Sequence, residues 1–122
     1  MSMKNPEENI VLQKTKAFAL RCIKLYKYMV DEKREFVISK QVLRSGTSIG
    51  ANVKEALRGQ SRADFASKMN IALKEASETE YWFELLTESE YLTESQGLDI
   101  LADCQEIIKL LTSIVKTTYS NS

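Results

Sequence analysis

The sequence predicts an all-α protein, an antiparallel up-down-up-down four-helix bundle. Apolar residues recur at three- and four-residue steps over most of the chain, and short polar stretches separate these periodic segments. The 122 residues include one proline and four glycines, which is too little turn chemistry for an all-β fold. We therefore expect one domain, residues 1–122, with helices at about 6–31, 40–58, 62–91 and 94–117.

The first two helices are predicted from their start and stop signals. Asn5 is a suitable N-cap for the first helix, and Pro6 then occupies the first helical position. This helix should end near Asp31, because the DEKRE stretch that begins there is too polar to bury. Ser39 is predicted to cap the second helix, which should end near Gly59.

The last two helices each begin with a capping box, in which two residues three apart satisfy each other's free backbone N–H groups. Ser61 and Asp64 form the first such pair, and Thr93 and Gln96 form the second. Beyond about residue 116 the TTYSNS tail is expected to fray.

The third and fourth helices carry more apolar residues than one stripe of a bundle helix needs. Surplus apolar surface of this kind usually indicates a subunit interface, so we expect a homo-oligomer. The alternative is that the fourth helix lies centrally in a tilted bundle. The candidate interface residues are Ile71, Trp82, Leu85, Ile107 and Ile114.

Residues 44–56, RSGTSIGANVKEA, contain two glycines inside a strongly helical sequence. A phosphate-binding loop is excluded, because neither GxGxxG nor GxxxxGK spacing is present and no strand precedes the stretch. A break between helices would leave Ile49 and Val53 without a place in the core. We therefore predict a continuous helix in which Gly46 and Gly50, one turn apart, let a second backbone approach closely beside these two apolar residues.

The composition excludes most enzyme classes. The chain has no histidine, which removes the usual general base and the Ser-His and Cys-His nucleophile pairs. Its two cysteines, Cys22 and Cys104, lack metal or redox spacing, and buried reduced thiols are favoured over a disulfide. We expect no catalytic, cofactor-binding or metal-binding residues. With no apolar run of membrane-spanning length and no signal-peptide pattern, we expect a cytoplasmic protein that does not enter the membrane.

The net charge is zero, but the two halves of the chain differ. Residues 1–62 carry 13 basic and 6 acidic residues, whereas residues 63–122 carry 4 basic and 11 acidic residues. One interpretation is pairing across an antiparallel hairpin, and the residues predicted to pair are Arg44, Glu55, Arg62, Glu75, Glu78 and Glu80. The other is a nucleic-acid surface, for which the candidate contacts are Lys16, Lys24 and Lys27. Glutamates 75, 78 and 80 beside Lys74 are also the only material for a metal or proton-transfer site, and structural pairing with Arg44 is the better account.

Residues 42–86 carry a dense sequence motif. The stretch RSGTSIGANVKEA matches the pattern RSGxSIxANxxEA, and the later stretch SRADFASKMNIALKEASETEYWFELL matches SxxDFxxKxxIALKExxExxYWLxLL except at Phe83, where leucine is usual. In these motifs the chain resembles the 23S rRNA intervening-sequence proteins.

The resemblance implies a bacterial four-helix bundle that commonly assembles as a homopentameric ring and has no established enzymatic activity. It also implies a relation to the accessory variability determinant of diversity-generating retroelements, which binds a reverse transcriptase and nucleic acid. We therefore expect a non-catalytic oligomeric scaffold or adaptor for RNA, DNA or a nucleic-acid enzyme such as a reverse transcriptase. The alternative is a protein–protein assembly module that binds no nucleic acid. No small-molecule substrate is expected.

Overall fold

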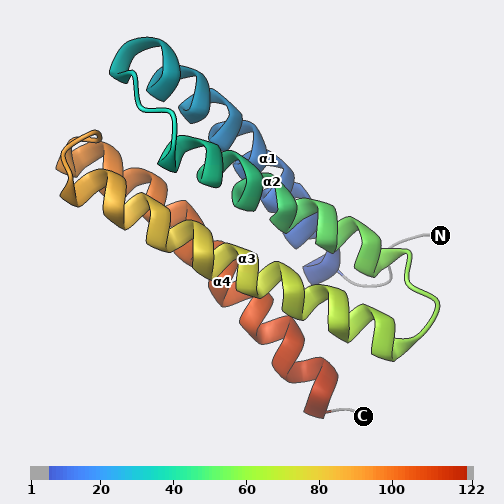
Figure 1. Cartoon of the computed structure of the whole chain (residues 1–122). Coiled ribbons are helices and arrows are strands. Elements are labelled where there is room, and N and C mark those ends of the chain that lie inside the picture. The colour runs from blue at the N-terminus through green and yellow to red at the C-terminus, as the bar shows by residue number, and fades with distance from the viewer. Residues whose placement is uncertain (1–5, 121–122) are drawn as a thin grey trace.

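The computed structural model describes residues 6–120, and it places nearly all of them in helices (Figure 1). Four long α-helices and one short π-helix occur within this range, and no strand does. In chain order they are α1 (Pro6–Tyr28), η1 (Met29–Lys33), α2 (Ile38–Leu57), α3 (Arg62–Glu88) and α4 (Glu94–Ser120). Asn5, the predicted cap of the first helix, lies outside the described residues. No helix in residues 6–120 combines the length and apolar character needed to cross a membrane.

Successive helices run in opposite directions, as predicted (Figure 1). The ion pairs between α1 and α4 show the same relation between the first and last helices. Lys14 pairs with Glu106 and Arg21 pairs with Asp99, so the position along α4 moves backward as the position along α1 moves forward. The four helices therefore form an antiparallel up-down bundle.

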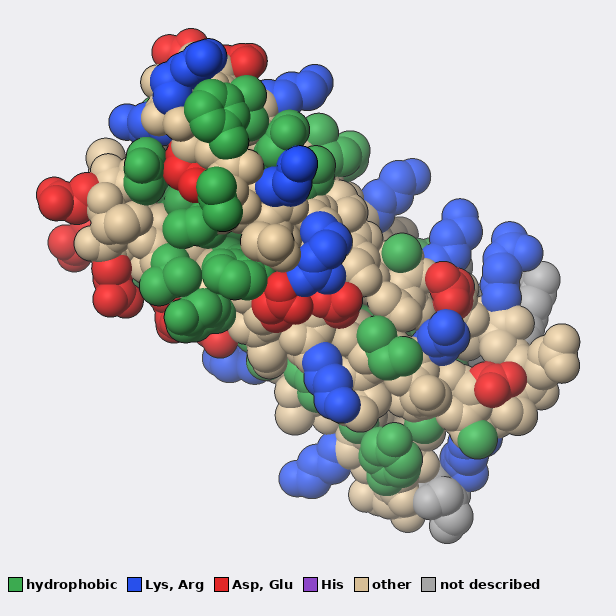
Figure 2. Space-filling view, viewed as in Figure 1, with side chains coloured by type: hydrophobic (Ala, Val, Ile, Leu, Met, Phe, Trp, Pro, Cys, Tyr) green, Lys and Arg blue, Asp and Glu red, His purple; other side chains and the backbone are tan. Residues whose placement is uncertain are grey.

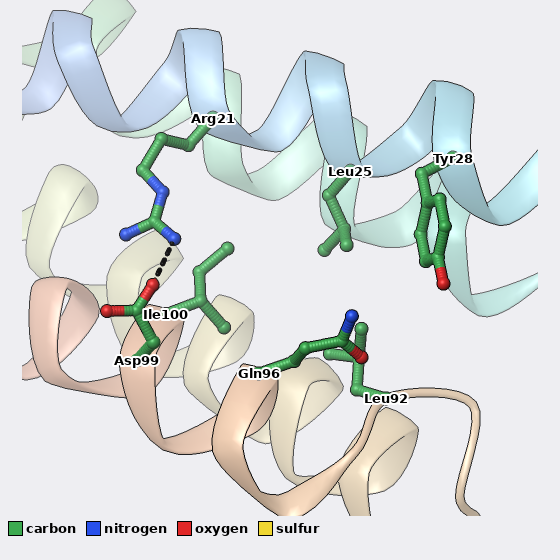
Figure 3. Close-up of a pocket in the computed structure, with 7 residues that line it drawn as sticks. All are labelled: Arg21, Leu25, Tyr28, Leu92, Gln96, Asp99 and Ile100. Atoms are coloured by element: carbon green, nitrogen blue, oxygen red, sulfur yellow. Dashed lines mark hydrogen bonds and ion pairs between the residues drawn. The ribbon is translucent and has the colours of Figure 1, made fainter.

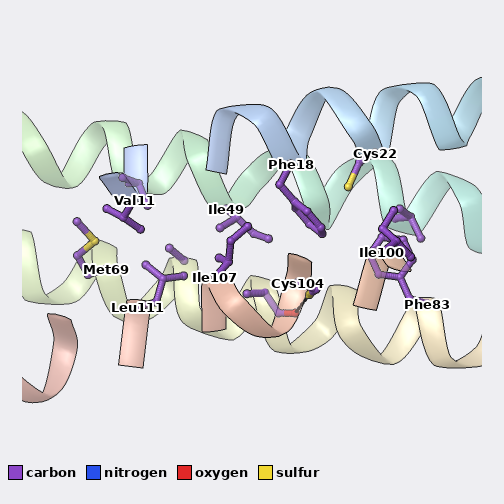
Figure 4. Close-up of a cluster of buried hydrophobic side chains, with 14 of the residues drawn as sticks. Val11, Phe18, Cys22, Ile49, Met69, Phe83, Ile100, Cys104, Ile107 and Leu111 are labelled. Atoms are coloured by element: carbon purple, nitrogen blue, oxygen red, sulfur yellow. Dashed lines mark hydrogen bonds between the residues drawn. The ribbon is translucent and has the colours of Figure 1, made fainter. Parts of the chain in front are cut away.

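The core lies between all four helices and is mainly aliphatic (Figure 4). Phe18 of α1 and Phe83 of α3 meet edge to face across its centre, with ring centroids 5.9 Å apart. Each fully buried side chain of this size contributes about 1.5–3 kcal/mol through removal from water. The largest other buried side chains are Val11, Met29, Val42, Ile49, Val53, Met69, Leu86, Ile107 and Leu111.

The connection between α1 and α2 differs from its predicted form. The first helix ends in the π-turn η1, followed by Arg34 in the left-handed region at φ 56°. Glu35 then folds back, and its carboxylate accepts hydrogen bonds from the backbone N–H groups of Val37, Ile38 and Ser39 at 3.1, 2.9 and 2.7 Å. The prediction that Ser39 caps the second helix is therefore wrong, because Glu35 satisfies the free N–H groups that a cap would satisfy.

Of the two predicted capping boxes, the second is complete and the first shows its N-cap hydrogen bond. The Ser61 hydroxyl accepts from the Asp64 backbone N–H at 3.1 Å. Thr93 and Gln96 cap each other, with the Thr93 backbone N–H donating to Gln96 Oε1 at 2.9 Å and the Gln96 N–H donating to Thr93 Oγ1 at 3.1 Å.

Two helix ends were misplaced. The third helix ends at Glu88 rather than near residue 91, and Glu90 takes a left-handed conformation at φ 69° in the turn. The fourth helix continues to Ser120, so the expectation that the chain frays after residue 116 is wrong as far as residue 120.

Candidate functional site

The glycine stretch lies inside α2, which is continuous from residue 38 to residue 57. Ile49 and Val53 are fully buried in the core, as the helical interpretation requires. Gly46 is buried and Gly50 partly buried. This stretch is therefore a packing surface of the bundle and not a ligand-binding loop.

The two glycines face α1 at different distances. A Cβ atom added at Gly46 would overlap the sulfur of Cys22, so no side chain fits there unless Cys22 shifts. A Cβ atom at Gly50 would lie 3.3 Å from Thr15 Oγ1 and 3.4 Å from the Thr15 carbonyl, which is tight but not overlapping. The close approach is thus made within one chain, between α1 and α2.

A polar network joins α2 and α3 along the outer edge of this packing surface. The Arg44 guanidinium contacts Glu78 through Nη2 and Glu75 through Nη1, the latter at 3.5 Å. Trp82 Nε1 donates to Glu78 at 2.9 Å, and the Ser48 hydroxyl donates to Glu75 at 3.2 Å. The network holds α2 and α3 in register and presents Arg44 with its side chain half exposed.

The contacts within this network favour the charged forms of Glu78 and Arg44. Partial burial opposes ionisation of Glu78, but hydrogen bonds from Arg44 and Trp82 together hold its pKa below its ordinary value. The hydrogen bond to Glu78 raises the pKa of Arg44. A carboxylate in this state is a poor proton carrier near neutral pH. Among residues 6–120 there is also no group of acidic or cysteine side chains arranged to hold a metal ion.

The remaining predicted charge pairs are only partly present. Glu55 lies 2.9 Å from Lys68, again joining α2 to α3. The proposed pairing of Glu55 with Arg62 stays a prediction. Glu80 was wrongly grouped with Arg44, because at about 100° per residue it lies about 160° around α3 from Glu78 and faces α4. There it accepts a hydrogen bond from Gln105 at 3.2 Å.

The contact between α1 and α4 is looser than the other helix contacts and is bridged by long side chains. Arg21 spans it, donating to Asp99 at 2.8 Å and to Asp103 at 2.5 Å. Burial opposes the charge on Arg21, but these two carboxylates raise its pKa. Beside Arg21 lies a small pocket of about 160 Å³ with an apolar floor (Figure 3). Its other lining residues are Leu25, Tyr28, Leu92, Gln96, Asp99 and Ile100.

The three candidate nucleic-acid contacts lie on the solvent side of α1. Lys16, Lys24 and Lys27 are exposed and take part in none of the ion pairs found among the described residues. They share this side with two apolar residues that the prediction overlooked, Leu20 at 56% and Ile23 at 36% exposure. The sequence could have identified both residues, because helical spacing places them away from the apolar stripe that contains Phe18.

The candidate interface residues divide into two groups. Ile107 and Ile114 are only 2% and 4% exposed in the single chain, so they belong to its core and are not available to a second subunit. The prediction failed for them because α4 buries a wide stripe against α3. Ile71 is 38% exposed, while Trp82 and Leu85 are partly exposed on the outer side of α3.

Tyr81, which was not among the candidates, is 53% exposed and its ring contacts that of Trp82 at a centroid distance of 5.3 Å. Tyr81, Trp82 and Leu85 form what we call the α3 patch. In Figure 2 hydrophobic side chains gather over the end of the bundle where α2 begins and α3 ends. Trp and Tyr are the residues most enriched in the energetic centres of protein interfaces.

The two cysteines are buried free thiols. Burial raises the pKa of Cys22 and of Cys104 to about 12. Both therefore stay protonated and unreactive at neutral pH.

Comparison with known proteins places these features in a family. The model of the 23S rRNA-intervening sequence protein family matches residues 7–113. A solved structure from Bacteroides thetaiotaomicron, of a protein with unknown function from the S23 ribosomal protein family, is 59% identical. The match covers 90% of this chain and 98% of that chain, with a TM-score of 0.89. A search of curated proteins found no match. On the family match, which extends over most of the bundle, the chain belongs to the 23S rRNA-intervening sequence protein family.

Proposed function

We propose that this chain is a non-catalytic, cytoplasmic scaffold that assembles with copies of itself and binds nucleic acid or a nucleic-acid enzyme such as a reverse transcriptase. The observation that carries the proposal is the separation of charge across the bundle. The basic half of the sequence forms α1 and α2, and the acidic half forms most of α3 and α4 (Figure 1).

Internal pairing uses only part of this charge. On α1 and α2, the basic residues Lys14, Arg21 and Arg44 pair with acids of α3 or α4. The exposed basic residues of these two helices that join none of the ion pairs of the described chain are Lys16, Lys24, Lys27, Lys40 and Lys54, and Arg58 directly after α2 is a sixth. In an oligomer each subunit would repeat this basic surface. Contacts from several subunits to the phosphates of one nucleic acid would then add, and nucleic-acid affinity depends on the number of such contacts.

A non-catalytic role agrees with the chemistry of the described residues. The chain contains no histidine. Glu75 and Glu78, the carboxylates closest to a cluster, are engaged by Arg44 and by neutral donors. Both thiols are buried. Recognition is therefore the use that these side chains support best.

The nucleic-acid part of the proposal is tested by fluorescence anisotropy with labelled RNA and duplex DNA between about 50 and 300 mM salt. We expect sub-micromolar binding at the lowest salt, falling with a log–log slope of about −0.7 to −0.9 for each phosphate contact. Replacing Lys16, Lys24 and Lys27 together with Glu should abolish binding. The matched control replaces three exposed lysines of α3 and α4, Lys74, Lys109 and Lys116, with Glu. Equal loss in both variants, or binding without salt dependence, would reject a specific α1 contact.

A second candidate function is that of an assembly module without nucleic acid, which the exposed α3 patch favours. It predicts a concentration-dependent oligomer in sedimentation equilibrium and no RNA or DNA binding in the same buffer. Stable assemblies have dissociation constants well below about 100 µM. A wild-type protein that is still monomeric at that concentration would reject both the scaffold and the assembly-module hypotheses.

A further inference from the structure

We propose that the solvent side of α1 in one copy docks head to tail onto the α3 patch of a second copy. This inference rests on the proposed self-assembly and names the two surfaces that meet. The docking and the nucleic-acid contact proposed above are alternative uses of Lys16, Lys24 and Lys27, and the two experiments distinguish them.

The donor surface, which we call the α1 face, combines apolar residues with lysines. Its members are Lys16, Leu20, Ile23, Lys24 and Lys27. At about 100° per residue they fall within an arc of about 100°, centred almost opposite the buried Phe18. The face runs over about 16 Å of helix at 1.5 Å per residue. None of its lysines joins an ion pair of the described chain, so their charges are available to a partner.

The receiving surface has the opposite charge and a similar apolar centre. Beside the α3 patch stand Glu84 and Glu88, both exposed and in none of the ion pairs of residues 6–120. At about 100° per residue they lie about 60° and 20° around α3 from Tyr81. Between residues 75 and 91 the sequence has six glutamates and no lysine or arginine. This strip therefore presents an aromatic and aliphatic centre with an acidic border.

A second copy fits this strip because the same chain carries both complementary surfaces. Each surface would repel itself, since the charged positions of the α1 face are all lysines and the exposed charges on α3 beside Tyr81 and Leu85 are Glu84 and Glu88. A two-fold contact of either surface with itself is thus disfavoured, and like charges facing each other across an interface are strongly unfavourable. Contact between unlike surfaces is heterologous, and it continues from copy to copy until a ring closes.

The acidic border also argues against nucleic acid as the occupant of the α3 patch, because phosphates would meet Glu84 and Glu88. Exposed aromatic rings can stack on bases, but binding of this kind needs a positive groove to follow the backbone. The apolar residues of the α1 face point the same way. Leu20 and Ile23 lie between the lysines, where a phosphate-binding surface gains nothing from them.

A charge-exchange experiment tests the docking. Variant one carries Lys24→Glu and Lys27→Glu, and variant two carries Glu84→Lys and Glu88→Lys. Sedimentation equilibrium should show wild type as an oligomer and each variant alone with its dissociation constant raised about a hundredfold or more, because like charges now meet. An equimolar mixture should reassemble, since the acidic α1 face of variant one then meets the basic α3 border of variant two. A single chain with all four substitutions should also assemble.

The control carries Lys54→Glu and Arg58→Glu, which make the same change of charge on exposed residues at the C-terminal end of α2, and it should keep the wild-type mass. Circular dichroism melts of every variant check that the bundle is folded. A monomeric wild type would overturn the proposed self-assembly itself. An oligomer that neither variant weakens, or a chain with all four substitutions that is folded but does not assemble, would overturn this pairing alone and leave the scaffold proposal in place.

Discussion

The two flanks of α1 are held in opposite ways. Toward α2, Gly46 and Gly50 remove side chains so that the two backbones approach until Cys22 and Thr15 touch the neighbouring helix. Toward α4, the helices stay apart, and Arg21 reaches across to two aspartates beside a pocket of about 160 Å³. One flank is held by close packing and the other by long charged side chains.

The difference shows how a small bundle distributes its stability. Close packing between backbones depends on atomic fit and is insensitive to salt. Ion pairs between half-exposed groups contribute about 0–1 kcal/mol each and are weakened by salt. We therefore expect the α1–α2 contact to contribute most of the stability that α1 gains from its neighbours. The α1–α4 ion pairs should contribute less, and mainly favour α4 as the helix that α1 faces.

The largest effect is expected at the tight flank. Gly46→Leu forces a branched side chain against Cys22, and because overpacking typically costs about 1–3 kcal/mol, we expect a loss of about 3 kcal/mol at this tight position. Urea unfolding followed by circular dichroism should show the loss directly. Gly46→Ala made together with Cys22→Ala is the control, because removing the sulfur opens room for the new Cβ atom. If Gly46→Leu unfolds at the wild-type urea concentration, the close approach does not stabilise the fold.

The second effect concerns the chain connection that closes the tight flank. Glu35→Gln removes the charge that caps α2, and loss of such a cap costs about 1–2 kcal/mol at neutral pH. Burial opposes ionisation of Glu35, but the backbone N–H groups of Ile38, Ser39 and Val37 lower its pKa below the ordinary value.

This shift gives the pH dependence a definite sign. A carboxylate with a lowered folded-state pKa stabilises fully above its unfolded pKa of about 4.3, and the contribution is lost as the pH falls through the lower folded-state value. Wild type and Glu35→Gln should therefore differ more in unfolding free energy at pH 7 than at pH 3. A difference that is the same at both values would mean that charge is not what the substitution removes.

The architecture was predictable because it depends on local and periodic features. Capping boxes such as Thr93 with Gln96, and apolar steps such as those through Phe18, act within one helix and are visible in the sequence. The same holds for the glycine stretch, where helical spacing placed Ile49 in the core.

What was missed depends on three-dimensional placement. The cap of α2 comes from Glu35, whose role needs the π-turn and the left-handed Arg34 that precede it. Ile107 and Ile114 looked like surplus apolar surface, but the width of the stripe that α4 buries follows from how it packs on α3. The partner of Glu80 likewise depends on which side of α3 faces α4.

A smaller effect is expected at the open flank. Arg21→Gln removes both ion pairs to α4, and because these groups are well exposed the cost should be about 0.5–1 kcal/mol. The difference from wild type should shrink further in about 0.5 M NaCl, where charges are screened within a few ångströms. Chemical unfolding in urea at both salt concentrations measures it. A loss as large as that of Gly46→Leu, unaffected by salt, would remove the contrast between the two flanks.

The smallest effect is expected for Gly50→Ala, where two contributions oppose each other. Alanine gains about 1 kcal/mol over glycine in a helix interior. The new Cβ atom, however, would lie 3.3 Å from Thr15 Oγ1, and that hydroxyl is held by a hydrogen bond to the Val11 carbonyl at 2.7 Å, so it does not turn away freely. We expect a net change within about 0.5 kcal/mol. In a Thr15→Ala background the hydroxyl is gone and the backbone of residue 15, at 3.4 Å, is the remaining contact, so Gly50→Ala should then stabilise the bundle by roughly 0.5–1 kcal/mol. A full gain already in the wild-type background would mean that α1 yields at this position, and that Gly46 alone sets the distance between the two helices.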